Sequence, residues 1–398
     1  MEMSNKKQQI PAIRFNGFTD AWEQRKFSNV VNRVSQQSND SNLPKVEFED
    51  IVSGEGRLNK DISHKFDSRK GTVFEPEFIL YGKLRPYLKN WLFPNFKGIA
   101  LGDFWVFEPN NSSSIFDYYL IQSDKYQTVA NISSGTKMPR SDWKTVSETV
   151  FSIPDSINEQ EKIGAFFKHL DNTIALHQRQ LNKYNKLKKT LLQKMFPKSG
   201  EKFPEIRFDG FVEEWKQCKL DQIVIERNQQ VPESIDYPLM SFTAKDGVTP
   251  KSDRYNREFL VKSDNKKYKK TELGDLIYSS NNLDVGSIGI NKTGNAVISS
   301  VYSIFYTRDG ITPEFVDMLI QRKDFINKMI QFRQGVVYGQ WRIHESDFLK
   351  IETRIPSSKE QIKMGALFKQ IDNTIAFHQQ KVNDYQKLKE ALLKKMFI

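Results

Sequence analysis

The sequence predicts an α+β protein in which two mixed α/β domains are separated by a two-helix antiparallel coiled coil. The main observation is an internal repeat. Residues 160–196 recur at 361–397, where 23 of 37 pairs are identical without a gap. The pattern Ile-Arg-Phe-x-Gly-Phe, followed by Trp, opens each half within residues 11–22 and 204–215. The inserts between pattern and repeat hardly resemble each other, and a duplicated frame with divergent inserts predicts two different binding surfaces.

The repeated segments predict two long helices. Their apolar residues advance by alternating steps of four and three over about five heptads, which is typical of a coiled coil. At ~1.5 Å per residue each helix is roughly 55 Å long, so pairing the two is the simplest way to bury both seams. We interpret the two seam histidines as polar residues that set the register, with a paired metal or pH-sensitive role as the alternative. The central seam positions are Ile174, His177 and Leu181 in one helix and Ile375, His378 and Val382 in the other.

The linkers predict that these helices run antiparallel. The first helix leads directly into the second insert, and the second helix begins directly after that insert. Because the two ends of a domain usually lie close together, the second helix starts where the first stops and runs back, which gives a pseudo-two-fold repeat. The predicted parts are a flexible N-terminus (1–10), domain 1 (11–156), the first spacer helix (157–197), domain 2 (198–356) and the second spacer helix (357–398).

Each insert mixes strand-like and helix-like stretches. Runs rich in β-branched and aromatic residues predict strands at 73–74, 78–81, 104–107, 276–278 and 301–306. Residues 115–123 and 313–332 are expected to be helical. Trp22 and Trp215, which follow the opening patterns, are predicted to be core residues.

Composition indicates a polyanionic partner. The net charge is +11, of which residues 160–196 and 361–397 hold +6 and +4 by our count. The lysines of these two segments are expected to face DNA, partner subunits or solvent. One cysteine, Cys218, excludes a disulfide framework, and five scattered histidines lack zinc spacing. With no signal-peptide pattern and no membrane-length apolar run, we predict a cytoplasmic, soluble chain without a metal.

The sequence carries no motif for chemistry. Pro-Pro, required by the Asn/Asp-Pro-Pro-Tyr/Phe element of adenine methyltransferases, does not occur, and neither does a Gly-x4-Gly-Lys-Ser/Thr phosphate loop. A nuclease-like pattern, Asp155 followed by Glu161 and Lys162, falls at the start of the first helix, where acidic residues stabilise the helix N-terminus. The sequence therefore predicts a binding protein and not an enzyme.

Basic and aromatic residues cluster in both inserts. Arginine can pair bidentately with guanine and lysine neutralises phosphate, so these clusters are candidate DNA contacts, with an ordinary surface turn as the alternative. The asparagines among them suit adenine edges or a turn equally well. In domain 1 the candidates are Lys83, Arg85, Tyr87, Lys89, Thr136, Lys137 and Arg140, and in domain 2 they are Asn281, Asn282, Tyr338, Gln340 and Arg342.

The order of these motifs resembles the DNA-specificity subunit of a type I restriction-modification system. The resemblance covers nearly the whole chain, from the opening patterns to the Asp-Asn-Thr-Ile-Ala stretches of both helices. In domain 1, residues 80–89 (LYGKLRPYLK) and the Ser-Gly-Thr at 134–136 are similar to segments of that family's recognition domains. Domain 2 departs from this form, with Tyr278-Ser-Ser-Asn281-Asn282 in place of the Gly-Lys-Leu-Arg-Pro-Tyr stretch.

The resemblance implies a non-catalytic reader of DNA. Each domain would read one half of an asymmetric, interrupted site, and the helices would set the gap between the halves. Two methyltransferase subunits that use S-adenosylmethionine and two ATP- and Mg-dependent restriction and translocase subunits would complete the complex, with no cofactor on this chain. The alternative is a coiled-coil scaffold whose globular domains bind proteins rather than DNA.

Overall fold

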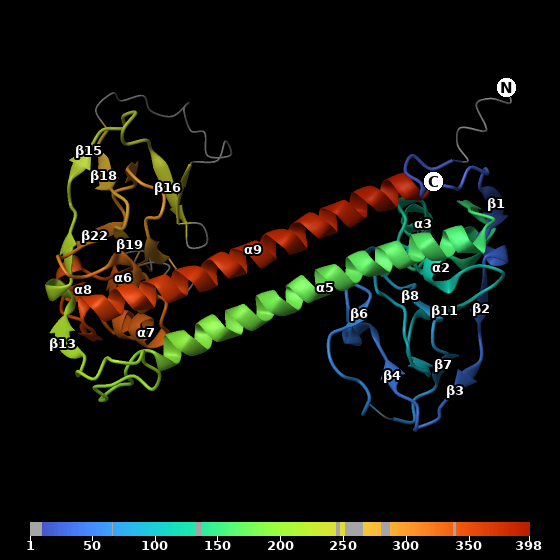
Figure 1. Cartoon of the computed structure of the whole chain (residues 1–398), viewed down its shortest axis with the longest axis horizontal. Coiled ribbons are helices and arrows are strands. Elements are labelled where there is room, and N and C mark those ends of the chain that lie inside the picture. The colour runs from blue at the N-terminus through green and yellow to red at the C-terminus, as the bar shows by residue number, and fades with distance from the viewer. Residues whose placement is uncertain are drawn as a thin grey trace. The chain divides into compact units, whose positions relative to one another are not determined.

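The structure is a computed structural model that describes residues 10–65, 67–132, 137–243, 247–250, 266–279, 287–336 and 340–398. The chain forms two compact units, Met1–Gln180 with His378–Ile398, and Leu181–Phe377. The long helices α5 (Ile157–Lys194) and α9 (Ser358–Met396) each contribute a part to both units (Figure 1). The mixed α/β class is confirmed, and two domains with long helices agree with the prediction.

The first unit contains two four-stranded sheets, a short hairpin, and a separate pair formed by its first and last strands. One sheet is antiparallel, with the order β2 (Val31–Val34), β11 (Phe104–Pro109), β8 (Ile79–Gly82) and β9 (Trp91–Leu92). The other has the order β3 (Gln37–Ser38), β7 (Gly71–Phe74), β10 (Gly98–Ala100) and β4 (Lys45–Val46), with β10 and β4 parallel. A short hairpin joins β5 (Ile51–Val52) to β6 (Arg57–Leu58). Strand β1 (Glu23–Lys26) pairs with β12 (Val150–Ile153), which leads directly to α5.

The core of this unit explains why the sequences of its central strands are continuous runs of apolar residues. Ile79 and Tyr81 of β8 pack into a cluster with the helices α2 (Ser114–Leu120), α3 (Asp124–Ala130) and α4 (Trp143–Glu148). Leu80, between them, packs on the opposite face with Phe74 of the second sheet. Successive strand residues point to opposite faces, and because both faces are covered, every residue of β8 is buried.

The opening patterns anchor the start of each long helix. Arg14 binds the carboxylate of Glu159 through Nε at 2.6 Å and Nη2 at 2.8 Å, and Glu159 is 1% exposed. Arg207 binds Glu360 in the same way, with both distances at 2.8 Å. The tryptophans that follow these arginines are buried, which confirms their predicted core role. The same contact therefore recurs within each unit.

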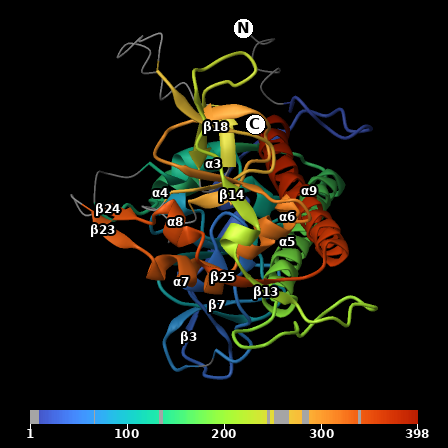
Figure 2. The same ribbon diagram turned by 90° about the vertical axis from the view of Figure 1, so that its left-hand side faces the viewer.

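The main sheet of the second unit has the same strand order as the main sheet of the first. Figure 2 shows the second unit facing the viewer. Its main sheet runs β14 (Val224–Glu226), β22 (Ser303–Thr307), β19 (Leu276–Tyr278) and β20 (Ile288–Ile290), and a second runs β15 (Gln230–Val231), β18 (Tyr268–Thr271) and β21 (Ala296–Ile298). Three strand pairs complete the described part: β13 (Lys216–Lys219) with β25 (Glu352–Ile355), β16 (Met240–Thr243) with β17 (Gly247–Pro250), and β23 (Gln334–Val336) with β24 (Gln340–Arg342).

Two sequence predictions in this unit were wrong in detail. The helix expected at 313–332 is two helices, α6 (Pro313–Ile320) and α7 (Lys323–Gln331). Arg322 interrupts them with an extended backbone, and its guanidinium lies 4.3 Å from the ring centroid of Phe196, a contact that helical periodicity does not reveal. The strand expected at 301–306 begins at Ser303, after a turn. A third helix, α8 (Glu345–Phe348), follows β24.

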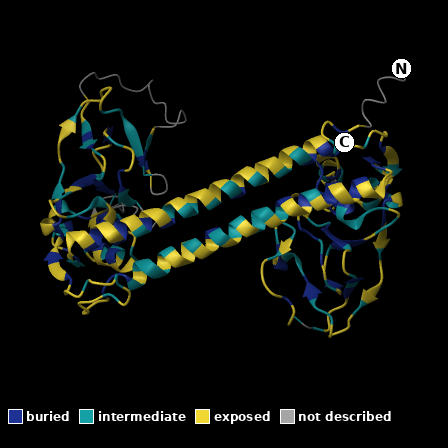
Figure 3. Cartoon of the chain, in the orientation of Figure 1, coloured by how far each residue is buried: buried dark blue, intermediate teal, exposed yellow. Residues whose placement is uncertain are grey.

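The long helices bury one stripe and expose the other (Figure 3). Among the predicted seam residues, Leu181 and Val382 are buried, whereas Ile174, His177, Ile375 and His378 are half-buried. Within the first unit α5 and α9 run antiparallel, because Phe167 contacts Phe397 while His177 contacts His378. Among the described residues, no helix is long and apolar enough to cross a membrane.

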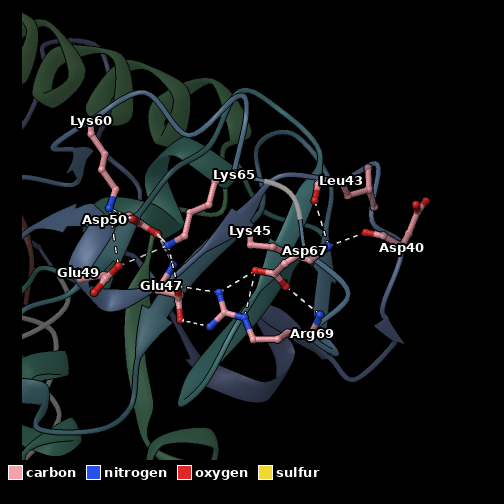
Figure 4. A network of polar contacts seen from close by, with 10 residues as sticks. All are labelled: Asp40, Leu43, Lys45, Glu47, Glu49, Asp50, Lys60, Lys65, Asp67 and Arg69. Carbon is pink, nitrogen blue, oxygen red and sulfur yellow. Dashed lines mark hydrogen bonds and ion pairs between the residues drawn. The ribbon is translucent and has the colours of Figure 1, made fainter.

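A network of charged side chains follows β4 in the first unit (Figure 4). The carboxylate of Asp50 has no exposed surface and lies 2.9 Å from Lys60 and 2.7 Å from Lys65. Glu47 accepts from Lys65 and from Arg69, and these partners hold its pKa below the ordinary value. The network ties Lys60, Lys65 and Arg69 to Glu47 and Asp50, which follow β4 in the chain.

Candidate nucleic-acid interface

Two separate stretches of the first unit meet at one edge. The residues after β8 and the residues before α4 form an antiparallel bridge between Leu84 and Arg140. On either side of it, the backbone N–H of Arg85 donates to the carbonyl of Pro139 at 2.7 Å, and that of Ser141 donates to the carbonyl of Lys83 at 2.9 Å. The structure thus brings together candidates that lie 48 to 57 residues apart in the chain.

An acidic residue that the sequence analysis missed holds two of these cations. Asp103 accepts from Arg140 Nη2 at 3.0 Å and lies 3.6 Å from Lys83 Nζ. Arg140 is 53% exposed and Lys83 31%, so both remain open to an incoming partner. Asp103 lies far from either stretch in sequence, and no local pattern marks it.

The turn that carries Tyr87 is strained on both sides. The 3-10 turn η4 (Pro86–Leu88) is flanked by Arg85 with φ of 49° and Lys89 with φ of 53°, both left-handed. Non-glycine residues in this region cost roughly 1–3 kcal/mol each and cluster at functional sites. Pro86 is buried, whereas Tyr87 is 56% exposed, so the tyrosine ring is accessible to a partner.

The second stretch, residues 137–140, adds a basic and an apolar side chain to this edge. Lys137 is exposed, and the neighbouring Met138 is 47% exposed. Thr136 lies outside the described residues. The assembled edge therefore presents basic side chains next to an exposed aromatic ring. Arg85, Lys89, Lys137 and Arg140 are exposed and Lys83 is half-buried, and Asp103 pairs with Lys83 and Arg140.

An aromatic layer supports this edge from below. Tyr81, at the end of β8, stacks on Trp105 at 6.1 Å, and Trp105 contacts Trp143 at the start of α4. Burial raises the pKa of the Tyr81 hydroxyl far above its ordinary value, so this ring stays neutral. The exposed guanidinium of Arg33 lies 4.9 Å from the ring centroid of Trp143. Arg33 is a further cation near this layer that the sequence analysis did not single out.

The second unit connects the corresponding segments. The hydroxyl of Tyr278, at the end of β19, donates to the carbonyl of Ile343 at 3.3 Å, just after β24. Arg342 pairs with Gln334 in the β23–β24 hairpin, and its Nη2 lies 4.0 Å from Glu345, which accepts from Ser303. Gln340 is opposite Val336 in the same hairpin. Asn281, Asn282 and Tyr338 lie outside the described residues.

Across the described parts of the chain, no group of three or more His, Cys, Asp and Glu side chains is placed to hold a metal ion. The arrangement offers hydrogen-bond donors, positive charge and an exposed ring, which suits recognition of a polyanion with readable edges.

Comparison with known proteins agrees with this chemistry. Residues 21–186 match the model of the type I restriction modification DNA specificity domain. The type I restriction enzyme MjaVIII specificity subunit of Methanocaldococcus jannaschii is 24% identical over 299 residues, which are 70% of this chain and 68% of the relative. These matches indicate the class of protein: it recognises DNA sequence, and its role is specificity and not catalysis.

Solved structures share the fold. The S subunit of a type I restriction-modification system from M. genitalium aligns with a TM-score of 0.64 at 14% identity, covering 98% of this chain and 99% of that one. A chain from a structural study of the assembly and conformational transition of a type I R-M system aligns with a TM-score of 0.52 at 18% identity, covering 96% and 99%. By these matches the chain is similar to type I restriction-modification DNA specificity subunits, and its residues 21–186 carry the match to that domain model.

Proposed function

We propose that this chain reads an asymmetric, bipartite DNA site, one half with each unit, and directs type I methylation and restriction subunits to it. The observation that carries the proposal is the basic edge of the first unit, where residues 83–89 and 137–140 are joined by backbone hydrogen bonds. Two chain segments locked together in this way present several donors in one fixed geometry, which sequence readout requires.

The residues of this edge have distinct roles in the proposal. Arg85 and Arg140 carry planar guanidinium groups suited to the O6 and N7 acceptors of guanine in the major groove. Lys83, Lys89 and Lys137 neutralise phosphates and set the register. Tyr87 supplies an exposed ring for apolar contact. In the second unit, Gln340 and Arg342, with Asn281, Asn282 and Tyr338, take the corresponding roles.

Different residues at the two reading edges support two different half-sites. The Lys-Leu-Arg-Pro-Tyr stretch of the first unit has no counterpart after β19 of the second, although the strand order of the main sheets is the same. A protein with one repeated frame and two unlike reading edges is suited to a non-palindromic site. The long helix α5, which lies between the inserts in sequence, and α9, which follows the second insert, would then set the gap.

The outer faces of the helices support partner binding. Leu176 and Leu187 of α5 are 51% and 40% exposed, and Phe377 and Leu388 of α9, each 201 positions later, are 51% and 44% exposed. Apolar side chains exposed at equivalent positions suit two copies of one partner. We assign these copies to methyltransferase subunits that hold S-adenosylmethionine. Two restriction subunits that use ATP and Mg complete the assembly, and one solved relative comes from a study of such a complex.

Methylome sequencing of cells that carry this chain with its methyltransferase partner tests the proposal. We expect methylated adenines in one motif made of two unlike half-sites with a fixed gap. Exchanging residues 11–156 for the corresponding domain of another specificity subunit should change one half-site and leave the other. A palindromic or uninterrupted motif contradicts the bipartite reading, and loss of all sequence-dependent footprints would favour the protein-binding scaffold.

A further inference from the structure

The second unit contains a groove outside its reading edge. It has a volume of about 1060 Å³ and lies between the last turns of α5, the residues that follow that helix, the start of α7 and strand β25. The candidate residues Gln340 and Arg342 are not among those that line it. The proposed reading of bases therefore leaves this groove without a role.

The groove is strongly basic. Seven of its lining side chains are Lys or Arg and two are Asp or Glu, an excess of five positive charges by subtraction. Some of this charge is already used, since Lys188 pairs with Asp372 at 2.7 Å and Arg322 pairs with Asp324 at 2.6 Å. Lys189 and Lys323 are exposed, and neither pairs with an acidic side chain in the described part of the chain. Two lysines in one groove are therefore left for an external anion.

The first unit provides an internal comparison. A groove of about 530 Å³ there uses the same five positions of the repeated helix, since residues 386, 389, 390, 393 and 394 are each 201 positions after 185, 188, 189, 192 and 193. That groove is lined by four basic and four acidic residues and carries no excess charge. Glu390 stands where the second unit has Lys189, so the charge is a property of one unit and not of the frame.

We propose that the groove of the second unit binds the sugar–phosphate backbone of the target DNA outside the bases that are read. This inference rests on the proposed function of the chain as a DNA reader. The contacts would position the duplex without reading sequence, because lysine neutralises phosphate irrespective of the base attached to it. Only one half of the site would gain them.

The lining favours nucleic acid over an acidic protein segment. Cores of protein–protein interfaces are rich in aromatic residues and depleted in lysine, whereas DNA-binding surfaces are more polar and much more positive. Five of the seven cations in the groove are lysines. Amide side chains such as Asn185, Gln193 and Asn327 also line it, and they add hydrogen-bond donors for phosphate oxygens.

The test is the salt dependence of DNA binding by the full chain with its methyltransferase partner. The variant is Lys189→Gln with Lys323→Gln, and the matched control is Lys168→Gln with Lys369→Gln, which removes the same charge from exposed helix positions outside both grooves. Each phosphate contact contributes about 0.9 to the slope of log Kobs against log salt. We expect the slope of the groove variant to fall by about 1.8, with equal weakening on specific and random duplexes and with the methylated motif unchanged.

The outcomes separate this inference from the proposed function. A groove variant with the slope of wild type overturns the inference, and one that instead loses its methyltransferase partner shows an acidic protein segment in the groove, which also overturns it. If the wild-type chain binds DNA without sequence preference, the proposed function is contradicted. The groove inference is still tested in that case, because the salt slope of the groove variant can be measured on random DNA. Circular dichroism of each variant shows whether it folds.

Discussion

The Nδ1 atom of His177 lies 2.9 Å from the Nδ1 atom of His378, and the two residues hold the same position in the repeated helix. A hydrogen bond at this distance needs a proton on one ring and a lone pair on the other. At most one of the two Nδ1 atoms is therefore protonated while they face each other. The ring of His177 also stacks on Tyr385 at 5.7 Å. The interpretation of the pair as a register-setting element stays a prediction.

The histidine pair should make the stability of the first unit depend on pH. Burial, His378 and Lys381 lower the pKa of His177 from its ordinary value of 6.5. The unfolded chain therefore binds more protons than the folded chain at mildly acidic pH, and stability is lost as pH falls below about 6.5. Thermal melting of wild type and of His177→Gln with His378→Gln between pH 5 and 8 should give the steeper pH dependence for wild type. Parallel curves would contradict this expectation.

The buried Arg14–Glu159 pair should be a main support of the first unit. Glu159→Ala leaves the guanidinium, whose side chain is 10% exposed, without its carboxylate, and breaking a buried pair typically costs about 3–5 kcal/mol. The exposed pair of Lys26 and Glu148 is the control, and Glu148→Ala should cost far less, because solvent screens an exposed ion pair. Urea denaturation measures both. Equal losses would mean that burial of the pair has no energetic consequence.

Arg85 and Arg140 should determine specific DNA binding. Replacing either by Ala is expected to weaken binding to the cognate duplex by about 1–3 kcal/mol for each lost base contact, with partner assembly intact. Arg25→Ala is a matched control, because Arg25 lies on β1 and bonds to Glu23 and Asp155. Fluorescence anisotropy on cognate and mismatched duplexes measures the change. Unaltered affinity of both variants would refute the assignment of this edge.

The length of the long helices should set the gap between half-sites. Seven residues inserted after Ile174, with seven more after Ile375, keep the seam in phase and add ~10 Å at the helical rise. At ~3.4 Å per base pair the preferred gap should grow by about three base pairs, or binding should be lost because of the added twist. The half-site sequences should stay the same. Methylation at the original gap would show that the helices only pack.

Cys218 should be unreactive in the folded protein. Its thiol is buried on β13, and burial raises its pKa to about 11, so the thiolate that reacts with disulfide reagents is scarce at pH 8. Because it is the single cysteine of the chain, its labelling reports on the opening of the second unit. We expect slow labelling in buffer and complete labelling in denaturant. Fast labelling in buffer would mean that the β13–β25 pair opens readily.

Local patterns in the sequence were enough to predict much of this protein. The repeat, the heptad steps and the opening motifs predicted the extent of α5 and α9 and the burial of Trp22 and Trp215, because helical periodicity and apolar anchors depend on near neighbours. The motif order also indicated the resemblance to type I specificity subunits, which the matches confirm.

Only the tertiary structure decided which distant residues meet. Asp103 joins Lys83 and Arg140, and Arg322 leaves the helical conformation beside Phe196, through contacts between segments that no local pattern connects. The basic groove is likewise assembled from residues 185 to 354, and its charge excess arises because lysines from separate elements converge. Periodicity determines which face of an element is buried, but pairing over long sequence separations depends on how the whole core packs.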